Sequence, residues 1–265
     1  MTAQTVTIVI LVSWNVAGRL KRLAEQAYCV LAESPDIVCL QEVTKASAPL
    51  WREALRIGGL DHVAVADIAA RPDARRPLGV LTAAREPIAE VPVPGVPWPE
   101  RVLSVRLGRS EIVNVHSPVS PSPGLAKVLT HEALLAHLSS AAAEPRIVCG
   151  DFNTPRAEKP DRTIWTFART RHGKLRPERG ERWDAAELAL LRGLEEHGFR
   201  DAYRDLHGWD HKNPSWEWPQ WGGGYRLDHL VVSDDVQVER VEYRHDWRRE
   251  LRLSDHSALV AEFSV

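Results

Sequence analysis

The chain has 265 residues, a length that fits one large domain with a substantial core. Lysine and arginine total 34 and aspartate and glutamate total 36, so the formal charge is −2. This balance excludes a polycationic nucleic-acid binder, and any contact with nucleic acid must come from a local basic patch. With 44% hydrophobic and 26% charged residues, the composition also excludes a disordered, collagenous or coiled-coil protein.

The cysteines and the start of the chain indicate a cytoplasmic location. Cys29, Cys39 and Cys149 each lie in an apolar run, and their odd number without a CxxC spacing favours buried free thiols over disulfides or a zinc knuckle. The apolar run near the N-terminus is too short to span a bilayer and lacks signal-peptide flanks. We therefore expect a cytoplasmic protein with no membrane segment.

Strands and helices are mixed along the first half of the chain. The run Thr5–Trp14 is almost continuously apolar, which is typical of a strand buried on both faces. Apolar residues at helical spacing follow over Leu20–Leu31. The further elements expected here are strands at Asp36–Leu40, His62–Ala66, Gly79–Thr82, Val102–Leu107 and Glu111–Val115, a helix at Pro49–Arg56, and an extended proline-rich segment at Pro92–Pro99.

The second half continues the mixture, so it does not fit a purely parallel sheet. The elements expected here are a proline-stiffened loop at His116–Gly124, helices at Leu125–Ala143 and Ala185–His197, a polar basic loop at Pro155–Arg182, and strands at Arg146–Cys149, Leu227–Ser233, Val236–Tyr243 and Ala258–Val265. We predict an α/β (α+β) fold in which two mixed β-sheets pack face to face with helices outside. No linker divides the chain, so we expect a single domain over residues 1–265.

Polar residues gather where the predicted strands end, which is where sites tend to form on a sheet. Asp151 and Asn153 are two residues apart, so an extended backbone would point both side chains the same way, toward a water and a phosphoryl oxygen. Glu42 and Asn15 follow two separate strands and are hard oxygen ligands, typical of a Mg²⁺ site. The absence of cysteine beside them argues against zinc.

His256 has a potential carboxylate partner in Asp228, and an Asp–His pair fixes the imidazole tautomer and stabilises the imidazolium. The competing interpretation of Asp228 is an ion pair with Arg226. His229 alternates with Asp228 along the strand, so we expect it to face the other way in a structural role.

Six sequence blocks carry a resemblance to a known family. They are SWNVAG, IVCLQEV, VNVHSP, GDFNTP, YRLDHLVVS and LSDHSALV, and they run in order from residue 13 to residue 260. In this order they resemble the endonuclease/exonuclease/phosphatase superfamily, and within it the exonuclease III type of DNA-repair nuclease. The stretch 173–233 is similar to the corresponding part of those enzymes.

The resemblance implies a four-layer αββα sandwich and a divalent metal, Mg²⁺ or Mn²⁺. Glu42 would ligate the metal, with Asn15 as ligand or support and Asp255 on the metal side. Asp151 would orient or deprotonate the attacking water, and Asn153 would hold the scissile phosphate. His256 would contact the phosphate as base or electrostatic stabiliser, oriented by Asp228.

One loop departs from the exonuclease III pattern. Those enzymes place a tyrosine after the VNV-like strand, whereas this chain has His116 and no tyrosine in NVHSPVSPSPG. The histidine resembles that of deoxyribonuclease I and the sphingomyelinase-like branches. This puts abasic-site cleavage in doubt, and it pairs His116 with His256 as a residue that assists the leaving oxygen.

Two further features bear on the substrate. Residues 155–182 hold nine Lys/Arg and four Asp/Glu, which would steer a phosphate backbone or form a solvated loop. Trp209, Trp216, Trp218 and Trp221 lie within thirteen residues, either stacking bases or buried beneath a loop. We take Trp216 and Trp218 as substrate contacts. Arg101 is interpreted as a phosphate contact or an ion-pair partner.

The first functional hypothesis is therefore a monomeric, divalent-metal-dependent DNA nuclease with a role in repair, which hydrolyses a phosphodiester by metal-assisted water attack. The alternative is a phosphoesterase of the same superfamily that acts on a small phosphodiester, a phospholipid headgroup or a phosphorylated sugar. A third hypothesis is a non-catalytic nucleic-acid-binding scaffold. The complete set of polar residues argues against it.

Overall fold

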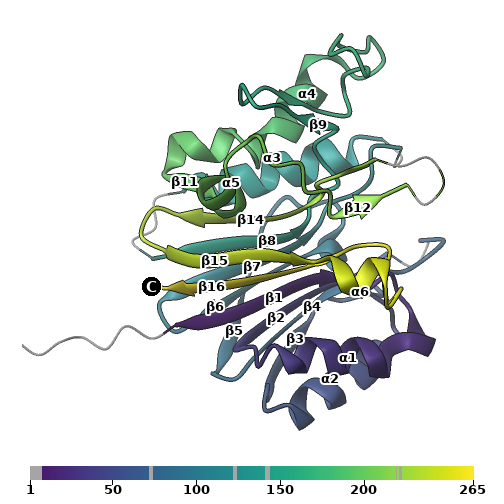
Figure 1. The fold of residues 1–265 in the computed structure, drawn as a ribbon, viewed down its shortest axis with the longest axis vertical. Coiled ribbons are helices and arrows are strands. Elements are labelled where there is room, and N and C mark those ends of the chain that lie inside the picture. The colour runs from purple at the N-terminus through teal and green to yellow at the C-terminus, as the bar shows by residue number, and fades with distance from the viewer. Residues whose placement is uncertain (1–7, 72–73, 122–123, 141–143, 219, 221–222) are drawn as a thin grey trace, which may run out of the picture.

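The computed structural model describes residues 8–71, 74–121, 124–140, 144–218, 220 and 223–265. Two six-stranded sheets pack face to face at its centre (Figure 1). The first sheet has the order β15-β16-β1-β2-β4-β3. Its strands are β1 (Val9–Asn15), β2 (Ile37–Val43), β3 (His62–Val65), β4 (Gly79–Ala84), β15 (Gln237–Arg244) and β16 (Ala258–Ser264).

The second sheet has the order β11-β14-β8-β7-β6-β5. Its strands are β5 (Ile88–Val91), β6 (Val102–Leu107), β7 (Ser110–His116), β8 (Arg146–Asp151), β11 (Phe199–Asp201) and β14 (Asp228–Ser233). Each sheet contains one parallel pair, β1 with β2 and β7 with β8, and its other pairs are antiparallel. Both sheets are therefore mixed, as predicted.

Helices cover the outer faces of the two sheets (Figure 1). Helices α1 (Leu23–Ala32) and α2 (Ala48–Ile57) lie on the first sheet, and α3 (Ala126–Ser139), α4 (Gly180–Ala189) and α5 (Ala202–His207) lie on the side of the second. The short α6 (His245–Arg249) follows β15. The predicted αββα sandwich is confirmed. Within the described residues, no helix has the length and apolarity needed to cross a membrane.

Alternation along the strands explains why their sequences are apolar throughout. Leu11 packs between the sheets, whereas Val12 packs beneath the helices on the first sheet. Ile147 and Val148 divide in the same way between the central core and the helices on the second sheet. Because neighbouring side chains of a strand point to opposite faces, a strand buried on both faces needs apolar residues at every position.

Some predicted boundaries were wrong. The helix expected at Ala185–His197 is α4 followed by a 3₁₀ helix at Gly193–His197, and it breaks before Gly193, a residue with low helix propensity. The helix expected to reach Ala143 ends at Ser139. The last part of that prediction, residues 141–143, and the beginning of the first strand, residues 5–7, lie outside the described residues.

The predicted loop Pro155–Arg182 contains the start of α4 and a two-stranded sheet of β9 (Ala157–Glu158) and β10 (Ile164–Trp165). Also not predicted from the sequence were β5, β11, α5 and α6, and the hairpin of β12 (Trp216–Glu217) and β13 (Gly224–Tyr225). These elements are two to six residues long, so a hydrophobic period can repeat only once or twice in each, and the sequence carries little signal for them.

A buried ion network fixes β9 against the second sheet. Arg226 donates to Glu158 at 2.9 Å through Nε and to Asp201 at 2.6 Å through Nη2. Arg204 of α5 donates to Glu158 at 2.8 Å through Nη2. Burial raises the pKa of the Glu158 carboxyl, but Arg226 and Arg204 outweigh burial and lower that pKa to about 2.

This network predicts an acid-sensitive contribution to stability. An unfolded glutamate titrates near pH ~4.3, so the Glu158 contribution is fully present above that pH and is lost as pH falls through about 2. We expect it to be on the order of 3 kcal/mol. In urea unfolding at pH 5 and pH 2, Glu158→Gln should lose less stability on acidification than the wild type. Glu239→Gln, an exposed control, should behave like the wild type, and equal pH slopes for all three proteins would refute the assignment.

Candidate active site

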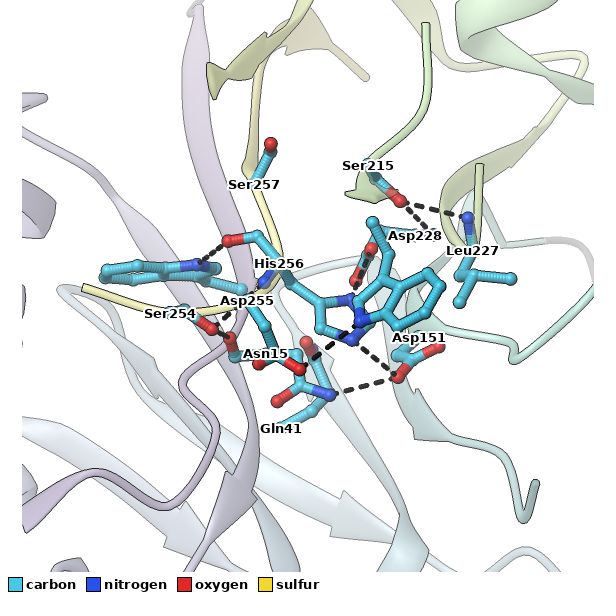
Figure 2. Close-up of polar contacts among 12 residues, drawn as sticks. Asn15, Gln41, Asp151, Ser215, Leu227, Asp228, Ser254, Asp255, His256 and Ser257 are labelled. Atoms are coloured by element: carbon cyan, nitrogen blue, oxygen red, sulfur yellow. Dashed lines mark hydrogen bonds and ion pairs between the residues drawn. The ribbon is translucent and has the colours of Figure 1, made fainter. Parts of the chain in front are cut away.

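The strand order brings the predicted site residues to one end of the sandwich. The parallel strands β1 and β2 end there at Asn15 and Val43, and β7 and β8 end there at His116 and Asp151. Strand β14 starts at the same end, because Asp228 pairs with Asp151. Figure 2 shows Asn15, Asp151 and His256 pointing toward one another.

Asn15 joins the two sheets at this point. Its Nδ2 donates to Asp151 Oδ2 at 3.0 Å, across from the first sheet to the second (Figure 2). The same amide nitrogen lies 3.5 Å from Glu42 Oε1. Asn15 Oδ1 accepts from the backbone nitrogen of Ala17 at 3.0 Å, which fixes the orientation of the amide. Asn15 thus places two carboxylates beside each other.

Local backbone distortion positions the carboxylates. The pairing of β2 with β4 shifts register between Leu40 and Val43, and Glu42 has φ 57°, in the left-handed region. Such a bulge re-aims a side chain at the end of a strand. Before Asp151, Gly150 has φ 128°, and a Cβ atom there would lie 2.0 Å from the carbonyl oxygen of Val115. Only glycine fits this approach of β8 to β7.

The predicted Asp–His pair is present. His256 Nδ1 lies 2.8 Å from Asp228 Oδ2, and His256 Nε2 lies 3.8 Å from Asp151 Oδ2 (Figure 2). The backbone around the imidazole is also held, since Trp14 Nε1 donates to the His256 carbonyl at 3.0 Å. The alternative ion pair of Asp228 with Arg226 does not form, because Arg226 pairs with Glu158 and Asp201.

The two histidines of the site have opposite electrostatic environments. Burial opposes the charged form of His256, but Asp228 and Asp151 outweigh burial and raise the His256 pKa to about 10. Burial, followed by Arg101 and His256, lowers the pKa of His116 well below its ordinary value. Burial raises the pKa of Asp151 to about 7, and the neighbouring Asp228 carboxylate contributes in the same direction. The site therefore holds a cationic and a neutral imidazole, a separation typical of divided acid–base roles.

His116 lies beside the same carboxylate as His256. Its Nε2 lies 3.8 Å from both Glu42 Oε1 and Asp151 Oδ2. Arg101 packs against this ring, with Nη1 2.6 Å from His116 Nδ1, and its guanidinium lies 5.8 Å from the centre of the Trp98 ring. Arg101 is thus buried at the site rather than paired with a distant carboxylate.

Asn153 reaches the site by a route that the sequence analysis described wrongly. The backbone is not extended after Asp151: Asn153 has φ 51°, and its backbone nitrogen donates to Asp151 Oδ1 at 2.9 Å. The Asn153 side chain donates through Nδ2 to the Ser117 carbonyl at 2.8 Å. A turn closed by the aspartate, rather than strand alternation, therefore fixes Asn153 relative to Asp151.

A buried lysine that the sequence analysis missed holds this turn. Lys127 Nζ donates to the Asn153 carbonyl at 2.7 Å and lies 2.8 Å from Glu187 Oε1. Glu187 also accepts from Thr154 Oγ1 at 3.1 Å and from the Phe167 backbone nitrogen at 2.6 Å. Lys127 lies in a helical pattern with no strand-end signal, so only the tertiary structure relates it to the site.

Lys127→Met should destabilise the protein by about 3–5 kcal/mol, because it leaves the buried Glu187 carboxylate without its cation. The free energy of unfolding in urea measures this loss. The double variant Lys127→Met/Glu187→Gln should recover part of it, since no unpaired charge remains. A loss below about 1 kcal/mol in the single variant would show that the pair is not coupled to folding.

The remaining predicted residues lie at the outer edge of the site. Asp255 is exposed, and its Oδ2 accepts from Trp216 Nε1 at 3.3 Å. Trp216 packs edge-on against Trp218, with ring centres 4.6 Å apart, and Trp218 is partly exposed. Trp209 packs against the core of the second sheet. Trp221 lies outside the described residues.

Several supporting residues were not selected as site residues from the sequence. Gln41 Nε2 donates to Asn114 Oδ1 at 2.9 Å, between the sheets. Ser215 Oγ accepts from the backbone nitrogens of Leu227 at 2.9 Å and Asp228 at 3.1 Å (Figure 2). The strand-end position of Gln41 and Asn114 was a usable signal, whereas Ser215 carried none. His229 faces away from His256, as predicted, and lies 2.8 Å from the Thr154 carbonyl through Nε2.

The donor set fits a hard divalent cation. The oxygens come from the carboxylates of Glu42 and Asp151, with one side-chain oxygen of Asp228 buried and without a hydrogen-bond partner in the described part of the chain. Asn15 supports these ligands through its Nδ2, because its Oδ1 accepts from the Ala17 backbone nitrogen. One carboxylate oxygen of Asp151, one of Asp228 and a ring nitrogen of His256 all lie within 4.8 Å of one another. The raised pKa of His256 favours the charged imidazolium, so the two carboxylates are the possible ligands of this group. Oxygen ligands with no thiolate are typical of Mg²⁺ and Mn²⁺. Asp255, whose carboxylate contacts Trp216, is not joined to this set by a described contact.

Comparison with known proteins now identifies the family. The model of the Endonuclease/Exonuclease/phosphatase family matches residues 12–256. The chain belongs to this family. Its enzymes hydrolyse phosphoester bonds and depend on divalent metals. A search of curated proteins found no match.

Two solved structures share the fold. An AP endonuclease from Archaeoglobus fulgidus is 20% identical, with a TM-score of 0.73, and the match covers 97% of this chain and 100% of that one. The 3′ phosphatase NExo from Neisseria, bound to a product DNA hairpin, is 21% identical, with a TM-score of 0.67, and the match covers 97% and 100% of the two chains. These similarities agree with the four-layer architecture described above.

Proposed function

We propose that this family member is a divalent-metal-dependent DNA nuclease that hydrolyses phosphodiester bonds. One observation carries the proposal: Asn15, Glu42 and His256, from one sheet and its loops, meet Asp151 and Asp228 of the other within hydrogen-bonding or ion-pair distance. A cation site, a water-orienting carboxylate and a charged imidazole together suit the hydrolysis of a phosphate ester, whose negative charge the cation and the imidazolium stabilise. Mg²⁺ is the metal we propose, with Mn²⁺ able to replace it.

The residues divide the work by position and charge. Glu42 would hold the metal, and Asn15 would support it by orienting the Glu42 and Asp151 carboxylates through Nδ2. The metal would supply charge neutralisation at the phosphate and at the leaving oxygen. Asp151 lies between Asn15 and His256, where it orients the attacking water and accepts its proton. The raised pKa of His256 favours an electrostatic stabiliser of the phosphate over a general base. Asn153 would hold a phosphate oxygen.

We assign His116 and Arg101 to the leaving side of the phosphate. His116 is neutral, because burial and Arg101 lower its pKa, and its Nε2 faces Glu42 and Asp151. Arg101 supplies a fixed positive charge beside the ring. Trp216 and Trp218 stand beyond Asp255, where their rings would stack on a base or sugar. Asp255 would act on the metal side.

End-labelled single-stranded, duplex and abasic-site DNA test the proposal directly. Wild-type protein should cleave at least one of them with Mg²⁺ or Mn²⁺ and none with EDTA. Asp151→Asn should lower kcat by about 100-fold or more, because it removes the group that accepts the proton. Asp255→Asn, at the outer edge, should lose less. The product ladder separates endonuclease from exonuclease action.

Failure to cleave any DNA would contradict the nuclease proposal. Metal-dependent hydrolysis of bis(p-nitrophenyl) phosphate without DNA cleavage would favour the alternative, a phosphoesterase for a small phosphodiester, phospholipid headgroup or phosphorylated sugar. DNA binding that persists in EDTA, with no hydrolysis of either substrate, would favour a binding scaffold.

A further inference from the structure

The basic stretch 155–182 is not one uniform patch. Arg169 pairs with Asp184 at 2.5 Å, and Arg182 pairs with Glu132 at 2.8 Å. These arginines stabilise the fold around α4. Arg156 and Lys159 lie at the other end of the stretch, close to the site, and neither forms an ion pair among the described residues.

Arg156 and Lys159 line a groove of about 540 Å³. Its walls come from three segments: the chain after β8 with Pro155 to Pro160, the chain before β12 with Lys212 to Pro214, and β13 with the residues beside it. We call this the flanking groove. The labels β9 and β12 mark its surroundings in Figure 1.

The charge of the flanking groove comes from its rim. At its floor, Arg204 and Arg226 are matched by Glu158 and Asp201. Three cations stand above this neutral floor, Arg156, Lys159 and Lys212. Lys159 Nζ lies 3.5 Å from the centre of the Trp165 ring, which positions its charge without neutralising it. The rim therefore presents three positive charges that form no ion pair among the described residues, although Lys159 also interacts electrostatically with the exposed Asp161 carboxylate.

The walls of the groove continue into the active site. Pro155 lies two residues after Asn153, and Arg226 lies two residues before Asp228. Pro214 precedes Ser215, whose Oγ accepts from the Asp228 backbone nitrogen. A nucleic-acid strand with its scissile phosphate at Asn153 and His256 would therefore place a neighbouring backbone phosphate near this rim.

We propose that the flanking groove binds a backbone phosphate of the nucleic acid next to the scissile one, through Arg156, Lys159 and Lys212. This inference rests on the proposed function and adds its substrate class, a polymer rather than a small phosphoester. A small phosphodiester carries its only phosphate to the catalytic residues and gains nothing from the groove. The cations bind by charge and not by base edges, so the contact is independent of sequence.

DNA binding without catalysis tests the groove separately from the nuclease proposal. Fluorescence anisotropy of labelled duplex and single-stranded DNA is measured with Asp151→Asn protein in EDTA, with and without Arg156→Ala/Lys212→Ala. We expect the double change to raise Kd about tenfold and to reduce the slope of log Kd against log salt by about 2, one for each lost phosphate contact. Arg109→Ala, at the far end of β7, is the matched control and should change neither quantity.

Turnover gives the second readout. In protein that keeps Asp151 and is therefore catalytically intact, Arg156→Ala/Lys212→Ala should lower kcat/KM for DNA at least tenfold more than kcat/KM for bis(p-nitrophenyl) phosphate. Equal losses on both substrates would overturn the inference, as would a Kd and salt slope equal to those of the control. A protein that binds DNA through the groove but cleaves nothing would refute the proposed function and leave the groove assignment standing.

Discussion

The hydrogen bond from Asn15 to Asp151 is the contact on which the site depends, because it joins the two sheets where their parallel strands end. Each sheet alone presents only part of the polar set: Asn15, Glu42 and His256 belong to the first sheet or its loops, and His116, Asp151 and Asp228 belong to the second. The apolar core between the sheets fixes their separation. A site shared between two sheets is therefore as rigid as the core beneath it.

The backbone at the site is unusual at the residues that carry the chemistry. Glu42 and Asn153 both have positive φ, which costs free energy for residues with a side chain. Contacts around them offset this cost: the register shift in β2 accommodates Glu42, and Lys127 and Ser117 hold Asn153. Strain of this kind is typical of positions where geometry serves a site rather than stability.

Electrostatics then separates groups of the same chemical type. Two imidazoles lie within ion-pair distance of one carboxylate, Asp151, yet their environments move their pKa values in opposite directions. At His256, Asp228 and Asp151 outweigh burial and raise the pKa, whereas at His116 burial lowers the pKa and Arg101 lowers it further. One site thereby offers a cation for the phosphate and a neutral ring for the leaving side.

The sequence predicted the long buried strands and the strand-end residues well, for a physical reason. A strand buried on both faces must be apolar throughout, and it must end where polar residues begin. The apolar runs of the sequence therefore predicted β1, β2, β7 and β8, and their ends predicted the positions of Asn15, Glu42, His116 and Asp151. Contacts between distant segments determine three other features: the turn at Asn153, the buried position of Lys127, and the hydrogen bond from the Asp228 backbone nitrogen to Ser215. Local patterns carry no trace of such contacts. Short strands such as β12 and β13 were missed for a different reason, because two residues are too few to show a hydrophobic pattern.

Metal binding tests most directly whether the two sheets build one cation site. Mn²⁺ titration followed by electron paramagnetic resonance would be performed on the wild type, Glu42→Gln and the exposed control Glu239→Gln. The structure predicts a bound Mn²⁺ whose affinity falls about 10–100-fold in Glu42→Gln and is unchanged in Glu239→Gln. Equal Mn²⁺ affinity in all three proteins would contradict the account, because the cation would then bind away from the residues that the sheets bring together.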